Sequence, residues 1–581
     1  MQRVKHIITK ATDGPRRIIT KATDTPRKRY IGLIVLLVLG GLVAGGWFYW
    51  DANKKSIIKN ELDKSIQKKT HGLYTLEYEK FELDEVAGSL VVTNVRLAYD
   101  SVILDSFERA SNAPSILVNA FIPRLAVSGV QTPQALIDKE IVGERLELFD
   151  PVIQLIYTNK GKDSVRHVPT KEVYRSLLGG LNMIRISKID IQRAQLSTRN
   201  INNDDTALNV KNITIGLTDL RIDSTSNADS NRLLFAQAIN LTAENIEWTN
   251  KKKLYRYEIR NVALNSVDRN ITIGKFIMDP LLGEDAFMRR VKTQIDRFDV
   301  SFDSIRLRNV DFTHLMDESI EADTLLLHKA NVKVYKDHGQ PRDKVNRIGT
   351  FPHQSLQKLP VTIDIRKAFI SNTFVEYKQN TPKSGKKGVV QFYNVNAAIN
   401  NLTNKKESIK ANNICRVDTR AMFMNTAALK ATFYLNLASK TGAYTIDGSL
   451  GAFNAEKVNT ISEPLAAAKI EKGTIKSLKM KLTGNDYSGK ATVTVLYDDL
   501  KVAVLEKDEE EKGKLGKKKF ASFAANVIIK NANPGRDGKV RTETGTFKRD
   551  TNRSFFNLVW KSLFVAIGQS LGAPVRNTPK D

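Results

Sequence analysis

The chain has almost no cysteine. Cys415 is the only one in 581 residues, so an internal disulfide is excluded and packing alone must stabilise the fold. Seven histidines are scattered along the sequence without the spacing that metal ligands need. We therefore expect neither a metal centre nor a cofactor.

Catalytic signatures are also missing. The sequence has no Gly-x-Ser-x-Gly elbow and no paired motif for a nucleophile with its base. Residues 484–490 have the glycine and lysine spacing of a phosphate-binding loop. However, Ala491 stands where a magnesium site needs a hydroxyl, and residues 491–496 alternate as a strand. We interpret this stretch as a hairpin turn and expect a protein that is not an enzyme. An anchored hydrolase assembled only by the fold is the weakest alternative.

Acidic residues are scarce relative to basic ones. There are 90 Lys and Arg against 63 Asp and Glu, which gives a formal net charge of +27. This balance suits an anionic partner. The chain lacks a recognised nucleic-acid module and basic runs interleaved with aromatics, so a membrane surface is favoured over RNA or DNA.

One long hydrophobic run is present. Residues 30–50 carry no charged side chain and are long enough for one crossing of a ~30 Å hydrocarbon core. Aromatic residues flank the run, as is typical of membrane interfaces. A cleaved signal peptide is the competing interpretation, but the run is too long and Trp47–Trp50 replaces the small residues of a cleavage site. The predicted membrane anchor includes Tyr30, Ile31, Leu33, Leu36, Leu39, Val43, Trp47 and Trp50.

The segment before this run is a basic tail, residues 1–29. It holds nine Lys or Arg against two Asp, a net charge of +7, which predicts that the tail stays cytoplasmic. Lysines that follow the run weaken this assignment. Residues 7–16 recur almost unchanged as residues 18–27. A disordered basic tail on anionic headgroups is preferred to a specific docking motif.

From residue 71 onward the dominant period is two, which predicts β-strands. A loose repeat of Asn, an apolar residue, any residue and a second apolar residue recurs along this region. Its irregular spacing argues against a propeller or a strict solenoid. It suggests a long sheet of similar strands, each with one apolar and one polar face. The repeat begins at Asn94, Asn212, Asn245, Asn261, Asn309 and Asn331, with a weaker copy at Asn394.

Helices are expected at few places. Residues 51–70 read as a helical linker, and residues 171–181, 284–297 and 462–470 are further candidates. Residues 554–571 are mainly apolar, but the segment contains Lys561 and Gln569 and is slightly short for a membrane crossing. They predict either an interfacial amphipathic helix or a cap over the end of the sheet. The residues expected to carry that role are Phe555, Val559, Trp560 and Leu563.

Short motifs are present in the first part and in the last third of the β region. The first part contains residues 88–92 and 146–155, and the last third contains residues 447–448, 470–474, 484–487 and 497–502. Through these motifs the chain resembles the AsmA-like envelope proteins of Gram-negative bacteria. The first two look like the family's opening strands and the others are similar to its C-terminal domain. The resemblance covers the whole architecture, and the middle of the chain matches only in strand pattern.

The resemblance implies a mainly β fold with few short helices, in which an N-terminal transmembrane helix precedes an elongated, curled antiparallel sheet with an apolar concave face. It also implies an inner-membrane anchor, with the bulk of the chain in the periplasm. The expected segments are a basic tail (1–29), the transmembrane helix (30–50), the linker (51–70), an elongated β region (71–410), an AsmA-like C-terminal β domain (411–550) and an amphipathic segment with tail (551–581).

These patterns favour two alternative functions. The first is binding or conduction of phospholipid in outer-membrane or envelope biogenesis, because an uncovered apolar face is unstable in water unless lipid or protein covers it. The second is an anchored scaffold with a closed core that binds other envelope proteins. The candidate groove residues, each equally explained as ordinary core, are Val95, Leu97, Ile213, Ile215, Val262, Leu264, Val310 and Phe312.

Overall fold

The structure is a computed structural model of the chain. It describes Gln67 and residues 70–579 except 85, 111–112, 115, 131–137, 159–177, 179–180, 202–205, 227–228, 230, 251, 315–317, 382–385, 508–514, 518–529 and 574. The predicted basic tail, the predicted membrane span and nearly all of the predicted linker lie outside these residues. Within the described part, no helix combines the length and apolar composition that a membrane crossing needs.

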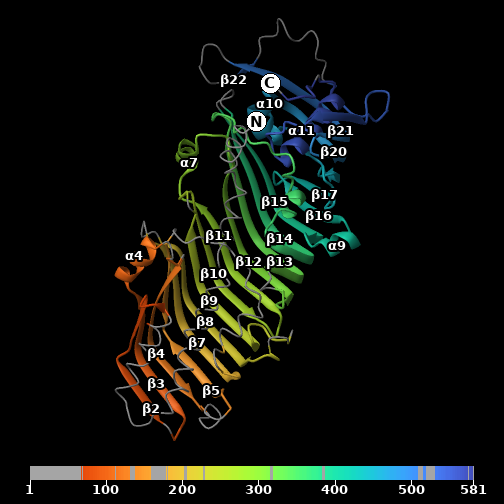
Figure 1. Cartoon of the computed structure of the whole chain (residues 1–581). Coiled ribbons are helices and arrows are strands. Elements are labelled where there is room, and N and C mark those ends of the chain that lie inside the picture. The colour runs from red at the N-terminus through yellow and green to blue at the C-terminus, as the bar shows by residue number, and fades with distance from the viewer. Residues whose placement is uncertain are drawn as a thin grey trace, which may run out of the picture. The chain divides into compact units, whose positions relative to one another are not determined.

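The described residues are mainly β-strand, as the period of two predicts, and long strands lie side by side in mixed pairing (Figure 1). The chain divides into two compact units. The N-terminal unit contains described residues up to 276 together with 308–314, and the C-terminal unit contains 277–307 and those from 318 onward. The boundary between them falls within β11 (Asn270–Pro280) and β12 (Arg297–Asp311).

The N-terminal unit is one sheet in which β4 pairs with both β5 and β6, and these two strands pair in turn with β7. β3 pairs with β1, β2 and β4, and the order continues through β7, β8, β9 and β10. Its apolar residues gather on one face of the sheet in a core cluster that includes Leu146, Ile184 and Ile222, all fully buried. The strands are β1 Tyr74–Glu77, β2 Lys80–Asp84, β3 Ser89–Tyr99, β4 Ile116–Ser128, β5 Glu140–Phe149, β6 Val152–Tyr157, β7 Met183–Asn200, β8 Thr206–Ile222, β9 Ala236–Thr249 and β10 Tyr255–Asn265.

The expectation of a purely antiparallel sheet is wrong. β5 and β6 both run parallel to β7, and β13 runs parallel to β14. A parallel pair needs a crossover of a dozen or more residues. The connection between β13 and β14, residues 338–361, meets that requirement and contains the short helix α8 (Pro352–Leu356).

The C-terminal unit continues as antiparallel hairpins after β14. The order runs β14, β15, β16, β17, β18, β20, β21 and β23, with β19 beside β20 and β22 beside β21. The division expected after residue 410 falls between the paired strands β15 and β16. The strands are β13 Ser319–Asp337, β14 Thr362–Thr381, β15 Lys386–Thr403, β16 Ile414–Phe423, β17 Ala427–Asn436, β18 Tyr444–Leu450, β19 Phe453–Asn454, β20 Ala468–Gly484, β21 Ser488–Lys507, β22 Leu515–Lys517 and β23 Glu543–Lys548.

The predicted hairpin turn at residues 484–490 is confirmed. β20 ends at Gly484 and β21 begins at Ser488, and Gly484 pairs with Gly489 across the turn. The Asn485 side chain accepts hydrogen bonds from the backbone N–H groups of Tyr487 and Ser488, at 2.9 and 3.2 Å. An asparagine that holds its own turn in this way is a common device of tight connections.

The predicted helices are confirmed in part. The candidate at 284–297 is α7 (Glu284–Val291), which ends early because Lys292 takes a left-handed conformation, φ 59°. The candidate at 462–470 is α10 (Asn459–Ala466), closed in the same way by Ala467, φ 51°. The candidate at 171–181 lies almost entirely outside the described residues. Helices that the sequence did not predict are α4 (Ser101–Arg109), α8, α9 (Lys406–Ala411) and the 3-10 helix η3 (Ala455–Val458).

The asparagine repeat is the signature of a β-bulge. Asn94, Asn212, Asn261 and Asn309 have φ between 51° and 53°, a left-handed conformation that asparagine tolerates better than most residues. Val210 and Ile213 on β8 are three residues apart, but their partners on β7, Leu196 and Ala194, are only two residues apart. β8 therefore accommodates one extra residue. The copies at Asn245 and Asn331 do not take a positive φ among the described residues.

The bulge explains the spacing of apolar residues along each strand. Ordinary alternation would place Val210 and Ile213 on opposite faces, but the extra residue keeps both on the apolar face. Asn212 then lies on the polar face, where its amide donates to the carboxylate of Glu244 on β9 at 2.9 Å. The repeat therefore maintains one apolar face along strands that bend.

Candidate functional site: the apolar face of strands β8 to β10

Apolar side chains on β8, β9 and β10 form a continuous surface on the inner face of the N-terminal unit. Cross-strand pairing brings Ile213 opposite Ala243 and Ala243 opposite Val262, so one row spans all three strands. Directly opposite residues share a face. We call this surface the β8–β10 apolar face; it consists of Ile213, Ile215, Ile246, Trp248, Tyr257, Ile259, Val262 and Leu264.

All eight residues of this surface are only half-buried. The neighbouring core on β7 differs, because Ile184, Ile186 and Ile189 are no more than 2 % exposed. The described helices that pack closely on strands do so elsewhere, α10 on β15 and β20, and α11 (Phe555–Ser570) on β20, β21 and β23.

Within the described residues the β8–β10 apolar face is partly covered: Ile213, Ile215 and Leu264 pack against the N-terminal core cluster. Val210 and Ala243, in the same rows, are only 7 % and 4 % exposed. The apolar area that stays exposed is of the kind that marks a binding surface.

An aromatic pair lies at one end of the surface. The rings of Trp248 and Tyr257, on β9 and β10, are stacked with their centroids 4.9 Å apart and an interplanar angle of 6°. Burial raises the pKa of the Tyr257 hydroxyl, so this end stays uncharged at neutral pH. The surface offers methyl, methylene and ring contacts and no charge, which is the chemistry that an acyl chain requires.

The predicted groove residues separate into two groups. Val95, Ile213, Ile215, Val262 and Leu264 are half-buried on strands of the N-terminal unit. The other three are core residues, with exposed fractions of 8 % for Leu97, 1 % for Val310 and 6 % for Phe312. Sequence reasoning missed Ile246, Trp248, Tyr257 and Ile259. The sequence signal that could have found two of them, Ile246 and Trp248, is the Asn245 copy of the repeat.

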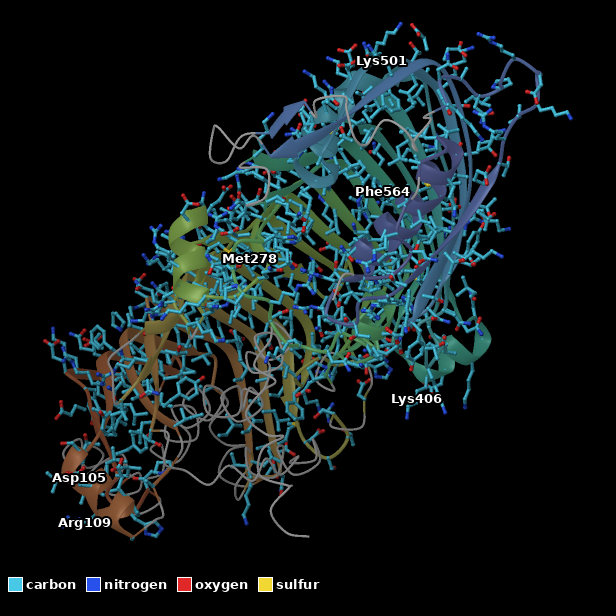
Figure 2. The ribbon with its side chains drawn as sticks, turned by 90° about the horizontal axis from the view of Figure 1, so that it is seen from above. Asp105, Arg109, Met278, Lys406, Lys501 and Phe564 are labelled. Atoms are coloured by element: carbon cyan, nitrogen blue, oxygen red, sulfur yellow. The ribbon has the colours of Figure 1, made fainter. Side chains whose placement is uncertain are left out.

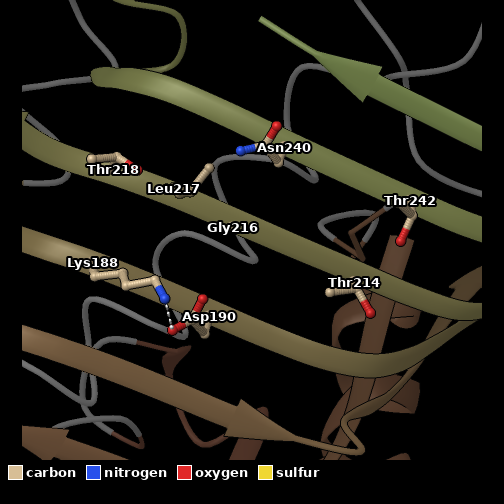
Figure 3. Close-up of a pocket in the computed structure, with 8 residues that line it drawn as sticks. All are labelled: Lys188, Asp190, Thr214, Gly216, Leu217, Thr218, Asn240 and Thr242. Carbon is tan, nitrogen blue, oxygen red and sulfur yellow. Dashed lines mark ion pairs between the residues drawn. The ribbon is translucent and has the colours of Figure 1, made fainter. Parts of the chain in front are cut away.

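The opposite face of β7, β8 and β9 is polar and carries a depression of about 270 Å³ (Figure 3). It lies around Gly216, which has no side chain to fill it. The one carboxylate in it, Asp190, accepts from Arg145 at 2.8 Å and pairs with Lys188 at 3.2 Å. The carboxylate is thus already paired, and the remaining polar groups of the lining are the hydroxyls of three threonines and the amide of Asn240. Its lining residues are Lys188, Asp190, Thr214, Gly216, Leu217, Thr218, Asn240 and Thr242.

Around α11 the C-terminal unit has a closed core, whereas apolar side chains on β13, β14 and β15 of the same unit, such as Val332, Phe374 and Phe392, are half-buried like those of the β8–β10 apolar face. Helix α11 covers β20, β21 and β23, and buries Leu558, Val565 and Ala566 to 1 % exposure or less. The predicted interfacial residues are split by this packing. Phe555 points into the core at 5 % exposure, Val559 and Leu563 pack against it, and Trp560 is 41 % exposed.

A buried ion pair fixes the loops beside this core. Arg549 and Asp486 are each 1 % exposed at the side chain, with Nη1 and Oδ1 2.6 Å apart. Asp486 also accepts from the Gln354 amide at 2.7 Å, and Arg549 stacks over the Phe351 ring at 4.3 Å. Because all four residues are buried, this constellation stabilises structure and has no access for a substrate.

Clusters of metal-ligating side chains are not found in the part of the chain that the structure describes. His353 is 2 % exposed within the C-terminal core, and burial lowers its pKa. Cys415 is buried too, and burial raises its pKa to about 11, which keeps the thiol protonated and unreactive.

No protein-family model matches the chain, and no curated protein matches it. The likeness to AsmA-like envelope proteins therefore stays a prediction that short sequence motifs carry.

Proposed function

We propose that this protein binds phospholipid on the β8–β10 apolar face. The observation that carries the proposal is the half-burial of all eight apolar side chains on three adjacent strands. Each exposed apolar Å² costs roughly 25 cal/mol in water, so a bound acyl chain stabilises this surface. The absence of charge on the surface favours a hydrocarbon ligand over a polar one.

The wider role is part of the same proposal. The uncharged run at residues 30–50 and the basic tail favour a single-pass inner-membrane anchor with the bulk of the chain in the periplasm. With the AsmA-like resemblance, this supports binding or conduction of lipid in outer-membrane or envelope biogenesis by a protein that is not an enzyme.

The second candidate is an anchored scaffold that binds other envelope proteins. Its support is the closed core beneath α11, where packing is complete without any ligand. If other segments of the chain cover the β8–β10 apolar face in the same way, no lipid is needed there, and the scaffold role accounts for the structure.

The test compares lipid content between variants of the full chain purified in a mild detergent. Ile215→Glu with Leu264→Glu introduces charge on the β8–β10 apolar face. Thr214→Glu with Ala263→Glu is the matched control, because these neighbours point to the other face and carry the same added charge. Circular dichroism checks that both variants keep the native strand content.

We expect mass spectrometry to find phospholipid with the wild-type protein and the control pair, and to find most of it lost from the apolar-face pair. Equal lipid content in both pairs, or a folded wild-type protein without lipid, would move the assignment to the scaffold.

A further inference from the structure

The outer side of α11 carries an exposed aromatic stripe. Phe556, Trp560 and Phe564 recur every four residues, which places them on one side of a helix. Phe556 is 66 % exposed and Trp560 is 41 % exposed. The rings of Trp560 and Phe564 lie 6.1 Å apart, and Figure 2 labels Phe564 on this helix.

The helix cannot rotate to bury the stripe, because its other side is fitted closely to the sheet. A Cβ added at Gly545 on β23 would lie 2.6 Å from the backbone nitrogen of Ala566. The side chains of Leu558 and Val565 already fill the core. The stripe is thus a fixed feature of the C-terminal unit, and one that has no role in closing its core.

The segment that carries the stripe is basic, and of its cations Arg553 is paired with Asp550 at 3.7 Å. Residues 551–580 contain no Asp or Glu, whereas Arg553, Lys561 and Arg576 are basic. The ammonium group of Lys561 lies 5.7 Å from the centre of the Phe564 ring. An aromatic surface with a lysine at its edge is suited to a ligand that joins hydrocarbon to an anion.

We propose that the stripe binds the acyl chain of a single anionic phospholipid, with Lys561 beside the phosphate. The stripe spans eight residue steps, or about 12 Å of helix, which is enough to contact a long stretch of one acyl chain. This inference rests on the proposed function and adds a second lipid contact, in the C-terminal unit, together with a headgroup charge.

The tryptophans allow the two lipid contacts to be measured separately. The chain has only Trp47, Trp50, Trp248 and Trp560. With Trp47→Phe and Trp50→Phe as background, Trp248→Phe leaves Trp560 as the reporter of the stripe. In the same background, Trp560→Phe leaves Trp248 as the reporter of the β8–β10 apolar face. The probe is phosphatidylglycerol with brominated acyl chains, which quench a tryptophan only on contact, added to the full-length protein in nonionic detergent.

We expect Trp560 fluorescence to be quenched, with saturation near one lipid per protein. Lys561→Gln should weaken this quenching about fivefold, the loss expected for one charge contact. Lys548→Gln, which removes an exposed lysine on β23, is the matched control and should leave it unchanged.

Three results would overturn the inference. Quenching of Trp248 without quenching of Trp560 removes the stripe contact but leaves the proposed function standing, whereas quenching of neither contradicts both. If Trp560 is quenched only by intact brominated vesicles and not by lipid in detergent, the stripe binds a bilayer surface and not a single lipid.

Discussion

Asparagine at the bulges is the residue choice that most directly connects this sequence to its fold. A left-handed φ costs a β-branched residue about 1–2 kcal/mol, and asparagine much less. The repeat was recognisable from the sequence, but its meaning was not. A period of two cannot show which copies, such as Asn212, take a positive φ and which, such as Asn245, do not.

Substitution at Asn212 tests this account. We expect Asn212→Val to lower the free energy of unfolding by about 1–2 kcal/mol, because valine resists φ near 53°. Asn212→Gly should come close to the wild type. Chemical denaturation followed by circular dichroism measures both, with Lys211→Val as the control for a new valine at a neighbouring position. Equal destabilisation by Val at 211 and 212 would argue against strain at the bulge.

His338 should make stability depend on pH. Burial, together with the charge of Arg553, lowers its pKa to about 4, below the unfolded value of about 6.5. Above pH 6.5 histidine is neutral in both states. As the pH falls from 6.5 to 4 only the unfolded chain takes up the proton, so the folded state loses stability by on the order of 2 kcal/mol. In the His338→Gln variant the melting temperature should fall less between pH 6.5 and pH 4 than in the wild type. An unchanged dependence on pH would contradict the assignment.

At the scale of elements, the hairpin at 484–490 and helix α11 could both be predicted from the sequence. The first rests on turn chemistry and the second on an apolar run of helical length. Which side of α11 is buried could not be predicted, because Phe555 and Phe556 are adjacent and equally apolar. The close approach between Gly545 on β23 and Ala566 decides it, and that contact depends on how the helix folds back onto the preceding strand.

The two sides of α11 should respond differently to truncation. Leu558→Ala removes a side chain that is 1 % exposed in the C-terminal core and should cost about 2–5 kcal/mol. Phe556→Ala removes a larger side chain that is 66 % exposed, and we expect a change of about 0.5 kcal/mol or less. Thermal unfolding of the two variants measures the difference. A larger loss at Phe556 would mean that the stripe is part of the core.

The pair between Asp486 and Arg549 joins the β20–β21 turn to the segment after β23. We expect Asp486→Ala to cost about 3–5 kcal/mol, because it leaves a buried guanidinium without its partner. Asp498→Ala removes the partner of Lys476 in a pair that is about half exposed on both sides. This control should cost about 1 kcal/mol or less. Urea denaturation compares the two, and similar costs would contradict a structural role for the buried pair.

At the scale of the molecule, composition and periodicity were enough to predict a mainly β fold. They were not enough to predict the parallel pairs, because strand direction depends on crossovers such as residues 338–361, whose path has no periodic signal. The candidate site was half predictable for the same reason. Ile213, Leu264 and Trp248 belong to copies of the repeat. Tyr257 and Ile259 belong to none, and their place opposite Trp248 and Ile246 depends on the register between strands.

The central claim is that lipid occupies the β8–β10 apolar face in the cell. A photoreactive phenylalanine analogue at position 264 points its side chain into that face, and the same analogue at position 263 points away from it. Irradiation of living cells, followed by purification and mass spectrometry, identifies whatever is captured. The account predicts phospholipid adducts at 264 and none at 263. Equal capture at the two positions, or protein adducts alone at 264, would contradict it.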